Sequence, residues 1–390
     1  HLPLDQSVAY GDELKVTGKL SDPPRLEGFN YRKYLERFGV QKIMKAPKSI
    51  EILCRGCEGN WVTRRASGLR NWMGSNLKAS LPSPHRELAM GILLGVKKEL
   101  PPSVKQSFQD SGLQHILVVS GSNIAIVMLC FQMVFRRFGP YINALFSILG
   151  IVFFVLMAGG DAPVIRAALM GSLAGIGVAG GQKIDVINAL LLSSCLMGLA
   201  IPSMIQSDLG FWLSFGATMG IIVFTPIFAL LLQTIQIPNS KYQITKSTSS
   251  SVPEFLNSHV WLSAILKILS MSLGAQLAVL PLLLLFFGSF PLGGVFANIF
   301  IEPLMPMLML GSSILGLCGS LSSGLVWPFR AVVYFGFEIL LSLSQWFSHF
   351  PALEIPQKLS FLSLIALLVL GLLLVLHPKL SEIHLAKPAK

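Results

Sequence analysis

Residues 209–231 have the sequence LGFWLSFGATMGIIVFTPIFALL. No side chain in this stretch ionises at neutral pH, and none does anywhere between Asp208 and Lys241. An α-helix needs about 20 apolar residues to cross roughly 30 Å of hydrocarbon. The stretch is therefore long enough and apolar enough to form a helix that crosses a lipid bilayer.

Four other intervals also lack ionising side chains. They run from 138 to 160, from 186 to 207, from 268 to 301 and from 303 to 329. Each is long enough for a crossing, whereas a soluble core would still need charged faces every two turns to meet water. Within a transmembrane domain at 111–377 we predict about nine spans, some of them broken. They lie at residues 115–135, 141–158, 163–181, 186–201, 209–231, 261–287, 295–319, 325–347 and 360–376.

The charged residues are concentrated near the N-terminus. The chain is 53% hydrophobic and 13% charged, against about 25% charged in ordinary soluble domains. Residues 1–110 hold 18 of the 30 Lys and Arg and 11 of the 19 Asp and Glu. The net charge of +11 fits an anionic partner, although part of it is a topology signal. We predict a polytopic α-helical membrane protein with a small N-terminal β-rich, OB-like external domain.

Residues 1–60 are patterned as a small β-barrel domain. Residues 13–20 (ELKVTGKL) alternate as a half-buried strand, residues 31–38 form a short helix, and residues 40–53 return to strand. This order fits part of an OB-fold seen without its beginning. Because the chain starts at His1 and not at Met, we expect it to be a fragment truncated at both ends.

Residues 61–110 are predicted to form an amphipathic helical linker. Its first helix, at 61–81, carries Arg64, Arg65 and Arg70 on polar positions. Such a helix can lie on the membrane surface or connect the head to the body.

Short basic loops set the orientation of the spans. Arg136 and Arg137 follow the first span, Lys183 follows the third and Lys241 follows the fifth. The odd-numbered exits and a basic tail at 378–390 are therefore placed in the cytoplasm, and the N-terminal head outside. We expect a multi-pass protein of the bacterial cytoplasmic (inner) membrane.

Three predicted spans are interrupted by proline, the seventh of them close to its middle. Pro226 interrupts the fifth, Pro281 the sixth, and Glu302-Pro303 the seventh. Proline removes a backbone donor, and at membrane depth a break survives only when it is buried in protein or lines a wet cavity. We expect such a cavity around Glu302, with a structural ion pair as the alternative.

Two further charged residues lie in or at the ends of spans. Arg166 lies one turn into the third span. Either it lines a pore, or it extends to the outer surface or pairs with Asp161. Asp208 begins the fifth span and fits a helix N-cap. Three amides can bond neighbouring helices. They are Asn123, Gln276 and Asn298.

The sequence offers no recognisable catalytic or metal centre. His115 precedes Ser120 by five residues, about 140° around a helix, so a Ser–His dyad is disfavoured. No H-E-x-x-H or G-x-x-x-x-G-K-[ST] motif occurs. Cys54 and Cys57 form a lone C-x-x-C, which can be a local disulfide in an oxidising compartment but is too few ligands for zinc. We predict no enzyme activity, metal or cofactor, which leaves transport, channel formation or scaffolding.

Six short motifs occur in a defined order. They are EGFNYRKYLERFGV at 27–40, SGLQHILVVSG at 111–121, PVIRAALM at 163–170, DVINAL at 185–190, DLGFWLSF at 208–215, and AQLAVLP at 275–281 followed by Asn298. In this order they resemble the ComEC family of bacterial DNA-internalisation channels, over about residues 10–350 of the chain.

The resemblance implies a channel for single-stranded DNA in natural transformation. The implied partners are single-stranded DNA, the lipid bilayer, a cytoplasmic ATP-driven helicase-like protein and an external DNA receptor, and a homo-oligomer is compatible. By resemblance, the channel or motif residues are His115, Ser120, Gly121, Asn123, Arg166, Asp208, Phe211, Ser214, Gln276, Asn298 and Glu302. Basic and aromatic side chains hold single strands, so the head candidates for DNA contact are Tyr31, Arg32, Lys33, Tyr34, Trp61, Arg64 and Arg65.

The chain departs from the family at two points. Ser122 and Asn123 stand where the family often has Leu-His, so no role of that histidine carries over. Many members also have a C-terminal nuclease domain, and no H-x-H-x-D-H motif occurs here. Two other hypotheses stay open. One is a small-molecule or ion transporter, for which broken helices near the midplane are equally typical, and the other is a non-catalytic membrane scaffold.

Overall fold

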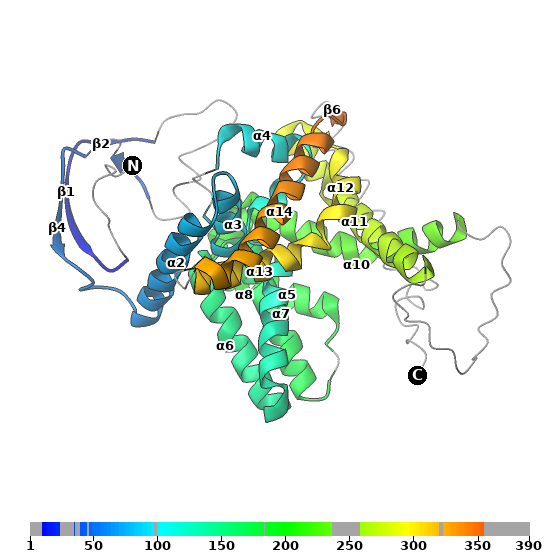
Figure 1. The fold of residues 1–390 in the computed structure, drawn as a ribbon, viewed down its shortest axis with the longest axis horizontal. Coiled ribbons are helices and arrows are strands. Elements are labelled where there is room, and N and C mark those ends of the chain that lie inside the picture. The colour runs from blue at the N-terminus through cyan, green and yellow to red at the C-terminus, as the bar shows by residue number, and fades with distance from the viewer. Residues whose placement is uncertain are drawn as a thin grey trace. The chain divides into compact units, whose positions relative to one another are not determined.

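The computed structural model (Figure 1) describes residues 10–23, 35, 40–44, 47–96, 100–182, 184–235, 258–319 and 323–354. Most of these residues are helical. The chain divides into two compact units. The first unit comprises His1–Glu99, Val118–Trp212 and Met309–Val332, and the second comprises Leu100–Leu117, Leu213–Leu308 and Val333–Lys390.

Two short antiparallel sheets form in the N-terminal head. β1 (Glu13–Thr17) pairs with β4 (Ser49–Cys54), and β2 (Leu20–Ser21) pairs with β3 (Ile43–Met44). The strands of the head that the structure describes form these two separate pairs and no closed barrel. The β-rich character of the head is present, and the finer OB-like prediction is not shown by these strands.

The predicted strands are shorter in the structure than in the sequence pattern. The strand at 13–20 is interrupted after β1 at Gly18, where a side chain would meet the Sδ of Met44 at 2.5 Å. The strand at 40–53 divides into β3 and β4 around Pro47, which has no N–H to donate. The predicted helix at 31–38 lies outside the described residues, apart from residue 35.

The amphipathic helix predicted at 61–81 is present as α2 (Trp61–Ser80). Asn60 caps it, because its Oδ1 accepts a hydrogen bond from the backbone N of Val62 at 3.0 Å. α2 packs against α3 (His85–Leu94), which ends at a glycine in the left-handed conformation.

Five helices among the described residues are long and apolar enough to cross a membrane. They are α6 (Pro140–Ala158), α7 (Ala162–Ala179), α10 (Leu209–Ile235), α11 (Ser258–Phe287) and α14 (Ser323–Phe347). α12 (Gly293–Ile301) and α13 (Leu304–Cys318) pass the same test as a pair, but the pair is bent by 55°. The prediction of a polytopic helical membrane protein is confirmed at this level.

The other three of the nine predicted spans are not seen as full crossings. The stretch 115–135 divides into a 3-10 turn, η1 (Gln114–Leu117), and α5 (Gly121–Phe135), which has 15 residues. The stretch 186–201 forms α8 (Val186–Ala200), also of 15 residues. Both helices are shorter than the roughly 20 residues of a full crossing. The predicted ninth span lies outside the described residues.

Only one of the three predicted proline interruptions breaks a helix. α10 continues through Pro226 and α11 through Pro281, so those two predictions are wrong. A membrane helix tolerates one missing backbone donor when its surroundings satisfy the freed carbonyl. The chain does bend at Glu302-Pro303, between α12 and α13.

Small residues bring α10 and α11 together within the second unit. Gly216 lies beside Ala278, and a Cβ on Gly220 would collide with the carbonyl oxygen of Gly274. Gly216 and Gly220 form a G-x-x-x-G pair, whose spacing is typical of closely packed membrane helices. The backbones of the two helices are therefore in direct contact.

In the first unit, α5, α6, α7 and α8 pack against one another in chain order. Buried Ala162, Met197 and Phe211 form a core cluster there. The remaining elements are α4 (Pro102–Asp110), η2 (Arg136–Phe138), α9 (Pro202–Ser207), and the antiparallel strands β5 (Ser289–Pro291) and β6 (Ala352–Glu354).

Candidate functional site

The start of α5 carries the serines of the signature run. Ser120 is the N-cap of α5, with an extended backbone (φ −110°, ψ 174°), and Gly121 begins the helix. The Oγ of Ser120 makes no capping bond and lies 2.7 Å from the Oγ of Ser122. A helix N-terminus leaves backbone N–H groups without intrahelical partners and carries partial positive charge. This end of α5 therefore presents hydrogen-bond donors.

Asn123 ties α5 to a neighbouring helix. Its side chain is 1% exposed, and its Nδ2 donates to the carbonyl oxygen of Ile92 in α3 at 2.9 Å. The amide thus has the helix-bonding role expected from the sequence. It also fixes the start of α5 against α3.

Arg166 lies in α7 against the start of α5. The residue is 9% exposed, and its Nη1 is 3.3 Å from the Sδ of Met170. Gly121 lies next to it, because a Cβ there would be in ordinary van der Waals contact, 3.8 Å from the Nη2 of Arg166 and 3.5 Å from the Cβ of Ala167. A guanidinium is thus held beside a helix N-terminus inside the first unit. Two positive features in contact favour a negatively charged group.

Arg70 of α2 comes close to the chain that enters α7. Burial lowers the pKa of Arg70, and the negative charge of Asp161 acts in the opposite direction by raising it. From the sequence, Asp161 is also a candidate partner of Arg166. The carboxylate lies within electrostatic reach of Arg70.

Asp208 caps α10. Its Oδ1 accepts a hydrogen bond from the backbone N of Gly210 at 2.8 Å. Phe211 is buried in the core of the first unit. Ser214, half-buried, belongs to the second unit, and its carbonyl oxygen accepts a hydrogen bond from the Oγ1 of Thr218 at 2.9 Å. The contacts of this motif are those of helix capping and packing.

Gln276 and Asn298 share one hydroxyl group in the second unit. The Nε2 of Gln276 and the Nδ2 of Asn298 donate to the Oγ of Ser272 at 3.2 and 3.0 Å. Ser272 donates in turn to the carbonyl oxygen of Val295 at 3.3 Å, which joins α11 to α12. Ser272 was not among the residues predicted from the sequence. The signal was its position four residues before Gln276, which places both on one helix face.

Glu302 and His115 are exposed residues of the second unit. Glu302 follows α12 at the bend, and its backbone N donates to the carbonyl oxygen of Asn298 at 3.0 Å. The Nδ1 of His115 lies 3.3 Å from the carbonyl oxygen of Gly112, so the ring bonds within its own turn.

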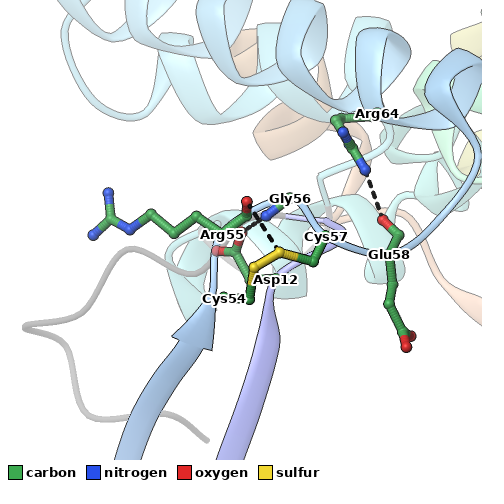
Figure 2. Close-up of a disulfide and its surroundings, with 7 residues drawn as sticks. All are labelled: Asp12, Cys54, Arg55, Gly56, Cys57, Glu58 and Arg64. Atoms are coloured by element: carbon green, nitrogen blue, oxygen red, sulfur yellow. Dashed lines mark hydrogen bonds between the residues drawn. A yellow bond between two sulfur atoms is a disulfide. The ribbon is translucent and has the colours of Figure 1, made fainter.

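A disulfide joins Cys54 to Cys57 in the head (Figure 2). The turn between them is held to β1, because the Oδ1 of Asp12 accepts a hydrogen bond from the backbone N of Gly56 at 2.9 Å. The C-x-x-C pair therefore closes the end of the β1–β4 sheet.

The start of α2 presents basic and aromatic side chains. Arg64 donates from Nη2 to the carbonyl oxygen of Glu58 at 2.9 Å, as Figure 2 shows. Trp61 is 71% exposed, and Arg65, four residues later in the helix, is also exposed. The other head candidates, Tyr31, Arg32, Lys33 and Tyr34, lie outside the described residues. Across the part of the chain that is described, no group of three or more His, Cys, Asp or Glu could hold a metal ion.

Comparison with known proteins identifies the family. Residues 92–380, which are 289 of the 390 residues, match the family described as Competence protein. The chain belongs to this competence family. The resemblance to ComEC proteins stated from the motifs is thereby confirmed.

Two curated relatives of this competence-family chain are similar over part of their length. ComE operon protein 3 of Bacillus subtilis (strain 168) is 24% identical over 342 residues, which are 86% of this chain and 39% of that protein. An uncharacterized protein of Aquifex aeolicus (strain VF5) is 28% identical over 158 residues, 40% of this chain and 37% of that protein. The chain thus spans about two fifths of the length of these relatives. No solved structure matches.

Proposed function

We propose that this chain forms the membrane channel through which single-stranded DNA crosses the bacterial cytoplasmic membrane in natural transformation. Membership of the competence family and similarity to ComE operon protein 3 support a role in DNA uptake. The observation that carries the channel proposal is Arg166, a guanidinium nine-tenths buried beside the N-terminus of α5. A cation inside a membrane bundle is costly and usually functional.

A passing phosphodiester group matches this site chemically. Each phosphate carries a negative charge, and the guanidinium of Arg166 and the N–H groups at the start of α5 are donors suited to its oxygens. Contacts to the phosphate backbone carry no sequence information. A channel that uses them accepts a strand of any sequence.

In this proposal the N-terminal head lies outside the cell, has an OB-like fold, and contacts the incoming strand through Trp61, Arg64 and Arg65. An external receptor delivers DNA to the head. The C-terminus lies in the cytoplasm, where an ATP-driven helicase-like partner supplies the energy. The chain itself catalyses no reaction, and copies of it can associate.

Uptake of labelled DNA by a strain that lacks the gene and is complemented with variants tests the proposal. Arg166→Ala should lower uptake about tenfold or more, because the phosphate loses its buried partner. Arg166→Lys keeps the charge without the planar fork and should give an intermediate value.

Arg330→Ala is the matched control, since it removes an exposed cation from α14, and it should leave uptake unchanged. The amount of each variant in the membrane is measured by immunoblot. Normal uptake by Arg166→Ala at equal protein would remove Arg166 from the mechanism, and the channel proposal would lose its support.

A further inference from the structure

Two carboxamide oxygens in the second unit are buried and have no hydrogen-bond partner among the described residues. They are the Oε1 of Gln276 in α11 and the Oδ1 of Asn298 in α12. Asn298 is 8% exposed. The nitrogen of each amide bonds to Ser272, so each oxygen lies on the side of its amide away from that hydroxyl.

Ser272 cannot donate a hydrogen bond to both carboxamide oxygens, because its hydroxyl has a single proton. A hydroxyl donates one hydrogen bond, and Ser272 donates it to the carbonyl oxygen of Val295. Exchanging the oxygen and nitrogen of one amide would let Ser272 donate to that oxygen, but only by releasing Val295. The other carboxamide oxygen would still be unpaired. Every arrangement therefore leaves at least one buried acceptor that needs a partner from outside this cluster.

The surroundings favour a cation as that partner. Asn298 lies in the last turn of α12, where the helix dipole places partial negative charge. Glu302 follows four residues later and adds a carboxylate near the same helix end. Carbonyl-type oxygens at the ends of broken membrane helices are ligands that sodium and potassium ions take from proteins.

Thr225 of α10 does not belong to this cluster. Its Oγ1 is also buried without a partner among the described residues, but it lies beside Gly274. At about 100° per residue, position 274 is on the opposite face of α11 from Ser272 and Gln276. Thr225 therefore offers a matched control.

We propose that Gln276 and Asn298 bind an alkali-metal cation, sodium or potassium, between α11 and α12. This site goes beyond the DNA-channel proposal and does not depend on it. The bound ion joins the carboxamide of α11 to that of α12, next to the bend at Glu302-Pro303. Water completes the coordination of the ion.

Binding of ²²Na⁺ and of ⁸⁶Rb⁺, a stand-in for potassium, to the purified full chain in detergent tests the proposal. Ionic strength is kept constant with choline chloride. At least one ion should bind saturably, at about one per chain, and be displaced by its unlabelled salt. No saturable binding of either ion would overturn the proposal and leave water as the partner of these oxygens.

Variants locate the site. Gln276→Met and Asn298→Leu remove the oxygens while keeping the side-chain size, and each should weaken ion binding about tenfold or more. Thr225→Val should leave it unchanged. Equal binding by wild type, Gln276→Met and Asn298→Leu would place the ion elsewhere and overturn the assignment. If one variant fails to fold, the other and the wild-type measurement still decide.

Discussion

Both units place polar groups in apolar surroundings, but the polar groups of the two units have opposite chemistry. In the first unit, Arg166 and the start of α5 present donors and positive charge. In the second, Gln276 and Asn298 present acceptors near the C-terminal end of α12. Polar groups at membrane depth need partners. The sign of the buried polar groups in each unit, more than their number, indicates the class of ligand.

The largest effect on stability is expected from Asn123→Leu in the first unit. The change removes the donor to the carbonyl oxygen of Ile92 and leaves that oxygen buried without its partner, which costs about 1–3 kcal/mol. The midpoint of thermal unfolding in detergent should fall clearly. Asn143→Leu is the control, because Asn143 is half-buried and its two side-chain bonds, to the carbonyl oxygen of Gln132 and from the Oγ of Ser147, are longer, at 3.3 Å each. Equal midpoints for the two variants would show that Asn123 does not anchor α5.

A smaller effect, dependent on the salt, is expected from Gln276→Met in the second unit. In choline chloride the variant removes an acceptor that has no partner among the described residues, together with the Nε2 donor to Ser272. Its free energy of unfolding should therefore fall by no more than about 1 kcal/mol. Sodium or potassium chloride should raise the unfolding midpoint of wild type by about 2–4 °C and leave the variant unmoved. A variant strongly destabilised in choline chloride would mean that Oε1 is already paired.

The smallest effect is expected from Asp161→Asn. The carboxylate raises the pKa of Arg70, but Arg70 is only half-buried, and water screens the pair. The loss in free energy of unfolding should stay below about 1 kcal/mol and shrink further in high salt. Unfolding measured at low and at high salt checks this. A large loss that salt does not change would show that Asp161 has a second, buried partner.

The apolar helices could be predicted because crossing a membrane is a local requirement on length. Long apolar stretches with few charges located α6, α7, α10, α11 and α14, and two of these helices, α6 and α10, contain no charged residue. The division of residues 115–135 at Ser120 could not be found this way, since apolar content is similar on both sides. The predicted interruptions at Pro226 and Pro281 were wrong because one missing backbone donor does not by itself end a helix.

The candidate site was predicted in part. Arg166 stood out because charge is rare in the body of the chain. Its position beside Gly121 depends on how α7 packs on α5, which no local pattern contains. Ser272 was missed because a serine in a membrane helix usually bonds its own backbone and draws no attention. Its role emerged only from the two amides that meet on it.

The close crossing of α10 and α11 limits how the second unit can move. With no side chain between Gly220 and the carbonyl of Gly274, the two backbones have nothing compressible between them. Turning either helix about its own axis would bring a larger neighbouring residue into the crossing and force the helices apart. The two helices are therefore expected to move together as one rigid pair. Any widening of the second unit must then come from the elements around this helix pair. The bend between α12 and α13 is a candidate position for such a movement.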